Sequence, residues 1–327
     1  MSLFGADFVR RAGALLAVDG AAPDLAFWER GYLFLADEAA MPVLARNCRM
    51  QTSLGAKVSV LDPAAIAARF TWLNPDGLAG AGLGLANEGW IDPAALLRAL
   101  RRKARALGVE FVTDEVVGIE LVRQRVAGVR MAGGDALSGA VLVNAAGPQA
   151  GALARLAGVD LPVRPRKRTT FVFDCRAALP PLPLTIDVSG VAFRPEGTRY
   201  IAIVSPPVER DPDSADLEPD HGLFDQAIWP ALAHRVPAFA AIKVTNAWAG
   251  HYDFNTFDQN AILGPHPSIE GLFFCNGFSG HGIQQAPAAG RAVAELIVHG
   301  GFRTLDLSAL SFARLGAGRR VREVNVV

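Results

Sequence analysis

The sequence predicts an α/β fold with two domains, and three segments lead to this prediction. Residues 272–300 read as a short apolar strand, a glycine-rich turn and a helix. Residues 92–147 follow the order helix, strand, hairpin, strand. Residues 161–255 instead alternate strand-like runs with proline-rich turns. Strands interleaved with helices are typical of a sheet with parallel strands, whereas the third segment favours a mixed sheet in a domain of its own.

The helix near residue 92 has both of its ends marked. Asp92 supplies an N-cap carboxylate, Pro93 suits the first helical position, and Gly108 ends the helix. After it we expect a strand at 109–112, a hairpin from 116–121 and 126–131, and a buried strand at 141–143. We expect the buried face of the helix to consist of four leucines, Leu96, Leu97, Leu100 and Leu107.

The segment from residue 272 to residue 300 carries the strongest functional signal. After the apolar run come Gly277, Gly280 and Gly282, which allow the backbone to approach a ligand closely. The following helix has Pro287 in its first turns and ends at Gly300. Free N–H groups and the positive end of the helix dipole favour negative charge at such a turn. The sequence therefore predicts a site for a negatively charged group here.

Composition excludes several classes of protein. The chain has 327 residues, 51% hydrophobic and 20% charged, which is typical of a compact globular protein. Its formal net charge is zero, so nothing draws it electrostatically to nucleic acid or to an anionic membrane. No apolar run reaches the roughly 18 residues that a membrane span needs.

Cysteine and histidine usage predicts reduced thiols and no bound metal. Cys48, Cys175 and Cys275 are few and widely separated, which favours free thiols in a cytosolic setting. The six histidines show no metal-ligand spacing, so we expect no metal. Met1 is not followed by a signal-peptide pattern, and we expect a cytoplasmic protein.

The motifs of the chain resemble those of the D-amino-acid oxidase family of flavoproteins, which includes glycine and sarcosine oxidases. The turn GFSGHG at 277–282 and, most specifically, the stretch 248–267 carry this resemblance, which spans nearly the whole chain. One branch, linked to assembly of respiratory complex I, is the most similar. The resemblance implies FAD as the cofactor and oxidation of a C–N bond in an amine or amino-acid-like substrate. Oxygen and a respiratory carrier both remain open as the electron acceptor.

One motif of the family is missing. Its members begin with a strand, a G-x-G-x-x-G turn that holds the FAD pyrophosphate, and a helix. Here residues 80–85 are only a near match, because Leu85 stands in place of the last glycine. Either the true start lies upstream, or half of the cofactor site has been lost. The expected fold is thus a Rossmann-like FAD-binding domain lacking its first βαβ unit, with a mixed-sheet substrate domain and weak FAD binding.

The resemblance also divides the chain into domains. We assign 1–40, 88–160 and 256–300 to the FAD-binding domain, 41–87 and 161–255 to the substrate domain, and 301–327 to a C-terminal tail. The residues expected to bind FAD are Val116, Asn144, Ala145, Ala146, Gly147, Gly277, Phe278, Ser279, Gly280, His281, Gly282, Ile283 and Gln284.

Four residues are candidates for contact with the substrate. Tyr252 stands near the place where glycine-oxidase-type members bind the substrate carboxylate with an arginine, and Gln284 where sarcosine-oxidase-like members use a lysine. Arg194 would supply the missing positive charge unless it is an ordinary surface arginine. His251 would touch flavin or accept a proton. These departures keep a second function open, a non-catalytic or weakly catalytic assembly protein that binds respiratory-complex subunits at the periphery of the membrane.

Overall fold

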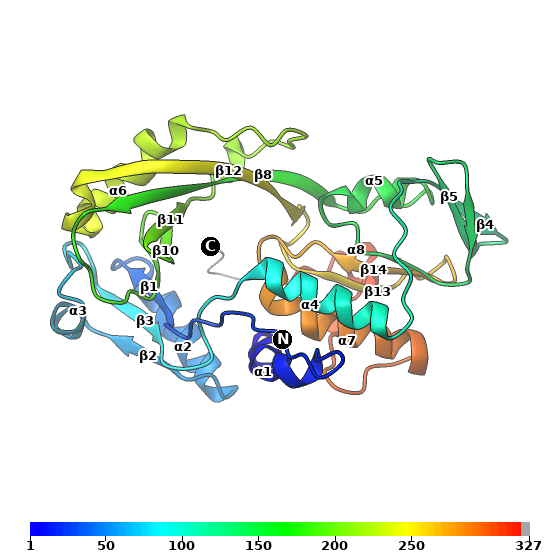
Figure 1. Cartoon of the computed structure of the whole chain (residues 1–327), viewed down its shortest axis with the longest axis horizontal. Helices are drawn as coiled ribbons and strands as arrows, with labels where there is room; N and C mark the ends of the chain where they lie inside the picture. Colours follow the sequence, from blue (N-terminus) through cyan, green and yellow to red (C-terminus); the bar gives the residue numbers. More distant parts are fainter. Residues whose placement is uncertain (322–327) are drawn as a thin grey trace.

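The computed structural model describes residues 1–321 and consists of two halves bridged by long strands (Figure 1). One half contains an eight-stranded mixed sheet. The other half contains a three-stranded sheet with helices packed beside it, and a third, small sheet lies at its far end. This is the mixed α/β architecture that the sequence predicts.

The large sheet has a long antiparallel pair at one edge. The edge strand β12 pairs with β8 along almost its whole length, and a bulge interrupts the register between Val244 and Asn246. In spatial order the strands are β12 (Ile242–Asn255), β8 (Val163–Cys175), β11 (Arg199–Ile203), β10 (Ala192–Glu196), β9 (Leu184–Ile186), β1 (Tyr32–Ala36), β3 (Gly80–Gly84) and β2 (Val58–Leu61).

One face of the large sheet carries the main core. Alternate side chains such as Phe171, Phe173 and Phe193 are at most 1% exposed and pack against Phe239 and Leu232. The alternation places the intervening residues, among them Arg168 and Arg194, on the opposite face. The helices of this half are α2 (Met41–Ser53), α3 (Pro63–Arg69), the π-helix η3 (Phe224–Ile228), α6 (Trp229–Arg235), and the 3-10 helices η2 (Val208–Arg210) and η4 (Pro237–Ala241).

The second sheet positions the glycine turn. Its order is β13 (Ile262–Pro265), β14 (Leu272–Asn276), β7 (Leu142–Asn144), and β14 runs parallel to β7. Two strands that run parallel bring their carboxyl ends to the same edge, so the turns after Asn144 and Asn276 are neighbours. The side chain of Asn276 confirms this by donating to the backbone oxygen of Asn144 at 3.0 Å.

Helices and short turns cover this second sheet. Helix α7 packs on β13 and β14, and α1 packs on α7 and α4. The elements are α1 (Ser2–Leu15), α4 (Pro93–Ala106), the 3-10 helix η1 (Gly147–Gln149), α5 (Ala150–Arg155), α7 (Gly282–His299), the 3-10 helix η5 (Ser308–Leu310) and α8 (Ala313–Gly316). The expected end of α7 is confirmed, because Gly300 adopts a left-handed conformation there.

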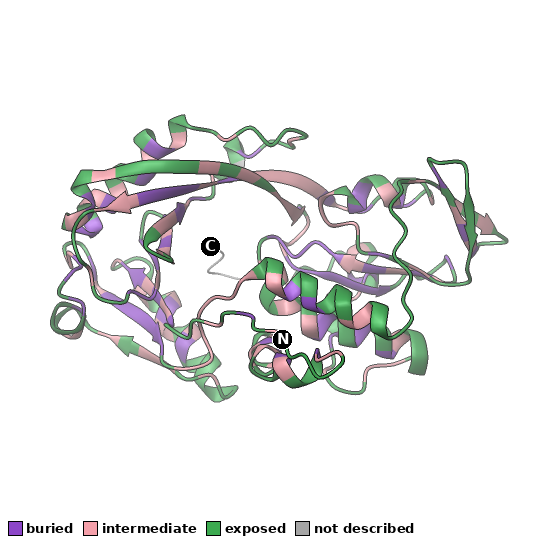
Figure 2. Cartoon of the chain, viewed as in Figure 1, coloured by how far each residue is buried: buried purple, intermediate pink, exposed green. Residues whose placement is uncertain are grey.

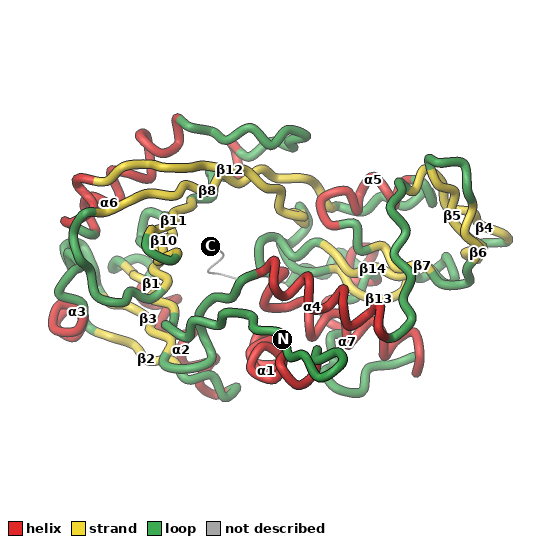
Figure 3. The backbone as a smooth tube through the Cα atoms, in the orientation of Figure 1, coloured by secondary structure: helices red, strands yellow, loops and turns green. Residues whose placement is uncertain are grey.

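The predicted hairpin is confirmed and gains a third strand. Strands β4 (Val116–Val122), β5 (Arg125–Met131) and β6 (Ala136–Ser138) form an antiparallel sheet at the far end of the molecule. The strand expected at 109–112 is wrong, since this stretch is loop (Figure 3). These residues are not part of any of the three sheets in the described part of the chain.

The helix α4 begins as predicted but buries less than expected. The carboxylate of Asp92 caps it by accepting from the N–H groups of Ala94 and Ala95. Of the four leucines, only Leu96 is buried, whereas Leu97, Leu100 and Leu107 are 57%, 40% and 73% exposed. Much of the ribbon of α4 is accordingly coloured as exposed (Figure 2). The buried residues of α4, Leu96 and Ala99, pack in a small cluster with Ala12 of α1. Val143, on the edge strand β7, is exposed as well.

Two expected boundaries differ from the sheets of the structure. Strand β1, within the range 1–40 expected for the FAD-binding domain, is part of the eight-stranded sheet together with strands from the range 161–255. Within the expected tail, residues 301–321 pack beside the three-stranded sheet, where Leu307 and Leu310 are buried against α7. The rest of that tail, 322–327, lies outside the described residues.

Candidate functional site

The glycine turn has the conformation that its sequence predicts. Gly277 and Gly280 have φ values of +75° and +100°, which side chains other than glycine rarely adopt. Ser279 also has a positive φ, +51°. Its hydroxyl accepts the N–H of Asn255 at 2.9 Å, a contact that fixes this unusual conformation. The turn is therefore rigid and closely bound to the end of β12.

Asp253 organises the same turn from the opposite strand. Its carboxylate accepts the N–H of Gly277 at 2.7 Å and that of Phe278 at 3.1 Å. Burial raises the pKa of Asp253 above its usual range, and these two donors oppose that shift. Sequence reasoning missed Asp253, although its place directly after Tyr252 put it beside the predicted turn.

Other N–H groups of the turn remain available. Within residues 1–321, those of Gly282, Ile283 and Gln284 have no hydrogen-bond partner in the protein. They form the first turn of an 18-residue helix, α7, whose dipole adds positive potential at this end. Nearby, at the end of β7, no atom lies within 4 Å of the position that a β-carbon would take at Gly147. The site thus offers donors and open backbone where a negatively charged cofactor edge fits.

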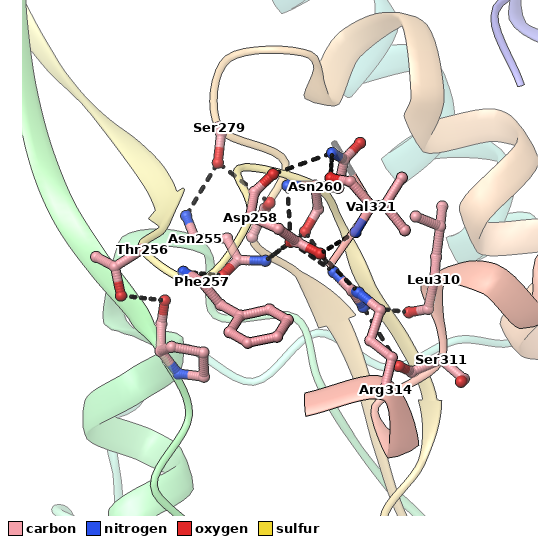
Figure 4. Close-up of polar contacts among 12 residues, drawn as sticks. Asn255, Thr256, Phe257, Asp258, Asn260, Ser279, Leu310, Ser311, Arg314 and Val321 are labelled. Atoms are coloured by element: carbon pink, nitrogen blue, oxygen red, sulfur yellow. Dashed lines mark hydrogen bonds and ion pairs between the residues drawn. The ribbon is translucent and has the colours of Figure 1, made fainter. Parts of the chain in front are cut away.

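A buried polar network anchors the turn to the C-terminal segment (Figure 4). Arg314 donates to both oxygens of Asp258, at 3.0 and 2.9 Å, and both side chains are at most 2% exposed. Asn255 donates to the same carboxylate at 2.8 Å. Burial raises the pKa of Asp258, but the hydrogen bond and charge of Arg314, together with the N–H groups of Val321 and Asn260, outweigh it and hold the pKa below its usual range.

Tyr252 lies directly against the turn. A β-carbon at Gly280 would be only 2.6 Å from Cε2 of the Tyr252 ring. The guanidinium of Arg168 lies over the same ring, 5.1 Å from its centroid, and Arg168 is paired with the buried carboxylate of Asp211 at 2.8 Å. Burial raises the pKa of Tyr252, so the phenol stays protonated and can donate a hydrogen bond. The structure therefore brings Tyr252 to the predicted cofactor turn.

Arg194 is not an ordinary surface arginine. Only 16% of its side chain is exposed, and its guanidinium stacks over Trp90 with 5.2 Å to the ring centroid. It also pairs with Glu196, at the outer end of β10. Burial and then the charge of Glu88 raise the pKa of the Tyr32 phenol, whereas the charge of Arg194 lowers it. Tyr252 raises the same pKa further. The register of β10, β9 and β1 places Arg194 and Tyr32 two strands apart at one level of the large sheet, so Arg194, Tyr32 and Tyr252 lie in one region.

Other predicted residues lie elsewhere or serve the fold. His251 points away from Tyr252, because neighbours on a strand alternate, and its Nε2 is bonded to the backbone oxygen of Asp216 at 2.8 Å. Val116 lies in the small sheet at the far end of the molecule. The Asn144 side chain donates a hydrogen bond to the backbone oxygen of Ala150 and accepts one from the N–H of Ala146, so it serves the fold.

Within the turn itself, backbone and side chains have different tasks. Phe278 is buried in the core beside α7, and Ser279 is bonded to Asn255, so neither side chain is free to meet a ligand. His281 precedes α7 and is half-buried, whereas Ile283 and Gln284 are exposed at the start of the helix. Ala145 and Ala146 leave the backbone at the end of β7 accessible. A ligand at this turn would therefore be bound mainly by backbone N–H groups and less by side chains.

Two further structural results concern other kinds of site. Across residues 1–321, no group of three or more histidine, cysteine, aspartate or glutamate side chains is arranged to hold a metal ion. In the same part of the chain, no helix has the length and apolar character required to cross a membrane.

Comparison with known proteins decides the family. The model of the DAO family, described as FAD dependent oxidoreductase, matches residues 5–296. The chain belongs to this family. FAD is therefore its cofactor, and the near match at residues 80–85 is excluded as a phosphate turn because Gly80–Gly84 is the fully buried strand β3.

Individual relatives agree with this assignment. FAD-dependent oxidoreductase domain-containing protein 1 of Bos taurus is 43% identical, over 99% of this chain and 73% of its own length. Mitochondrial sarcosine dehydrogenase of Homo sapiens is 26% identical, over 83% of this chain and 31% of its own. The crystal structure of L-proline dehydrogenase from P. horikoshii has a TM-score of 0.84 at 22% identity, covering 98% and 83% of the two chains, and is thus similar in fold.

Proposed function

We propose that this FAD-dependent oxidoreductase oxidises the C–N bond of an amine or amino-acid-like substrate. The observation that carries the proposal is the juxtaposition of the glycine turn with Tyr252 and, on the same face of the large sheet, Arg194. The likeness to a relative named sarcosine dehydrogenase supports it. FAD, when bound, supplies the chemistry by accepting a hydride from the carbon next to the nitrogen.

The residues of the chain have separate tasks in this proposal. The N–H groups of Gly282, Ile283 and Gln284 would hold the negatively charged edge of the cofactor, with the dipole of α7 behind them. Gly147 and its neighbours would let the cofactor lie against the backbone. Tyr252 donates one hydrogen bond to the substrate, and Arg194 binds its carboxylate.

Arg194 is suited to this task by its surroundings. Its guanidinium is planar, permanently charged and held by Trp90, and such a group binds a carboxylate through two parallel hydrogen bonds. Its partner Glu196 is 53% exposed, so a substrate carboxylate can replace that contact while Glu196 remains solvated. The arrangement favours a substrate with a carboxylate close to the reacting amine.

The experiment is Arg194→Ala in the FAD-loaded protein. Loss of a charge-assisted contact is worth about 1.5–3 kcal/mol, so kcat/KM for a carboxylate-bearing amine should fall roughly 10- to 100-fold. Arg130→Ala is the matched control, because Arg130 is an exposed arginine of the distant small sheet. Unchanged kinetics of Arg194→Ala would remove this residue from the site.

A second candidate is a binding or assembly role for a respiratory complex. Exposed apolar side chains on the cofactor half support it, since large exposed apolar areas usually meet other molecules. They include Leu97, Leu100, Leu107, Phe111 and Val143. In cells that lack the protein, complex I activity restored equally by wild type and by Arg194→Ala would favour this role. Restoration by the wild type alone would tie any such role to catalysis.

A further inference from the structure

Glu88 is a carboxylate held in place beside the proposed substrate region. It lies in the loop between β3 and α4, and its Oε2 accepts the N–H of Tyr32 at 3.2 Å. A β-carbon at Gly84 would be 1.6 Å from that oxygen, so only glycine lets the carboxylate lie against β3. The carboxylate therefore has a fixed position between β1 and β3.

The loop that carries Glu88 is itself braced. Asn87 has a φ of +61°, and its N–H donates to the carboxylate of Glu29 at 2.6 Å. Arg10 of α1 donates to the side-chain oxygen of Asn87 at 2.8 Å and pairs with Glu29. These contacts hold the backbone of the loop next to Glu88, and they lie outside the proposed substrate region.

Glu88 lacks a cationic partner. Four well-buried carboxylates, Asp187, Asp211, Asp258 and Glu295, are each paired with an arginine, whereas Glu88 is only partly buried and, in the described part of the chain, has no such partner. Within residues 1–321, no lysine, arginine or histidine nitrogen lies within 4.0 Å of the Glu88 carboxylate, and its Oε1 has no donor. Burial raises the pKa of Glu88, and the single N–H from Tyr32 opposes that shift only in part. Glu88 therefore keeps one carboxylate oxygen free to accept a hydrogen bond from a cation.

Glu88 lies near two titratable side chains, Tyr32 and Cys48, and Tyr32 connects it to Arg194. The Tyr32 phenol experiences the negative charge of Glu88 and the positive charge of Arg194 together. On the other side, burial and then Glu88 raise the pKa of the Cys48 thiol. Arg194 lies over Trp90, which is two residues along the chain from Glu88. A negative and a positive side chain therefore both lie near Tyr32, as the ammonium and carboxylate of one amino acid would require.

We propose that Glu88 binds the ammonium nitrogen of a zwitterionic amino-acid substrate whose carboxylate is held by Arg194. This inference rests on the proposed function. An N⁺–H···O⁻ contact in a partly desolvated site is about twice as strong as a neutral hydrogen bond. The site then discriminates in favour of primary and secondary amino acids and against simple carboxylic acids.

A purely structural role for Glu88 can be separated from this one. In Glu88→Gln, the amide oxygen can still accept the N–H of Tyr32, so the support of β1 is kept and only the negative charge is removed. Thermal unfolding and FAD content of Glu88→Gln should match those of the wild type. Glu29→Gln is the matched control, because it alters the neighbouring brace without facing the substrate.

The experiment measures binding to the FAD-loaded full chain by calorimetry, with the flavin reduced by dithionite under anaerobic conditions so that the amino acid is not oxidised. The probes are N-methylglycine and L-proline, each beside an isostere in which oxygen replaces the nitrogen, methoxyacetate and tetrahydrofuran-2-carboxylate. For the amino acid that the wild type binds, Glu88→Gln should raise Kd at least tenfold. The same change should leave the Kd of the oxygen isostere unchanged or lower it. Arg194→Gln should weaken both members of the pair.

The outcomes are distinct. If Glu88→Gln binds the amino acid as tightly as the wild type, the role of Glu88 is wrong while the proposed function stands. If Glu88→Gln weakens amino acid and isostere equally, Glu88 supports the site only structurally and the inference is again wrong. If the wild type binds neither of these amino acids nor any other amino acid of a wider panel, both the proposed function and this inference fail.

Discussion

The Tyr252 ring and Gly280 are in contact across the boundary between the two halves of the molecule. Tyr252 belongs to the long edge strand of the large sheet, and Gly280 belongs to the turn that opens α7. Asp253, the next residue of that strand, accepts two N–H groups of the same turn. The half that contains the large sheet and the half that contains the glycine turn are therefore joined at this point, and changes here should affect both.

Gly280→Ala should damage the site through this contact. A residue other than glycine at a φ of +100° costs about 1–2 kcal/mol, and the new methyl group must also displace the Tyr252 ring. We expect stability to fall by roughly 1–3 kcal/mol and FAD affinity to fall roughly tenfold. Denaturant unfolding and FAD titration measure the two effects.

Gly290→Ala provides the control for that substitution. Gly290 lies within α7, where nothing is within 4 Å of the added methyl group and φ is ordinary. Because alanine favours helix by up to about 1 kcal/mol over glycine, this variant should be slightly more stable and bind FAD normally. Equal loss of FAD affinity in both variants would contradict the special role of the Gly280 contact.

Arg314→Met should unfold the protein far more easily than a surface change. The substitution leaves the Asp258 carboxylate buried without its cation, which costs about 3–5 kcal/mol. Arg125→Met is the control, because both partners of the Arg125–Glu270 pair are about two-thirds exposed, and it should cost under about 1 kcal/mol. Similar unfolding midpoints for the two variants would show that the network in Figure 4 contributes little.

Glu295→Gln should reveal a pH-dependent brace at the end of α7. Hydrogen bonds from the Thr304 hydroxyl and the Arg303 N–H, among others, lower the pKa of Glu295 to about 2. Because the folded-state pKa lies below the unfolded one, the stabilisation is complete above the unfolded value of 4.5 and is lost as the pH falls toward about 2.

Denaturant unfolding at several pH values measures this effect. Wild type should be more stable than Glu295→Gln at pH 7, and the difference should shrink as the pH is lowered between those two pKa values. Glu110→Gln, at an exposed position, should show no such difference. A gap between wild type and Glu295→Gln that does not change with pH would refute the proposed cause.

The sequence was informative where a local rule determines the structure. The glycines of the turn, the cap of α4 by Asp92 and the end of α7 at Gly300 each follow from the chemistry of one or two residues. The hairpin β4–β5 follows from alternation and a short turn. These features needed no knowledge of distant parts of the chain.

The sequence was less informative where distant segments decide. Residues 109–112 have strand propensity but join none of the three sheets among the described residues, and Leu97 has an apolar side chain but is exposed. The roles of Asp253 and Glu88 depend on the approach of Gly277 and Tyr32, which periodicity does not reveal. Arg194 could be separated from a surface arginine only by its burial against Trp90.

The most direct test of the proposed function is anaerobic reduction of the FAD-loaded protein by amines. N-methylglycine, L-proline and a panel of other amino acids are mixed with the protein while the visible flavin band is recorded. We predict that at least one amino acid bleaches the band in the wild type and does so more slowly in Arg194→Ala. A band that no amine bleaches, although dithionite does, would contradict the assignment as an amine or amino-acid oxidoreductase.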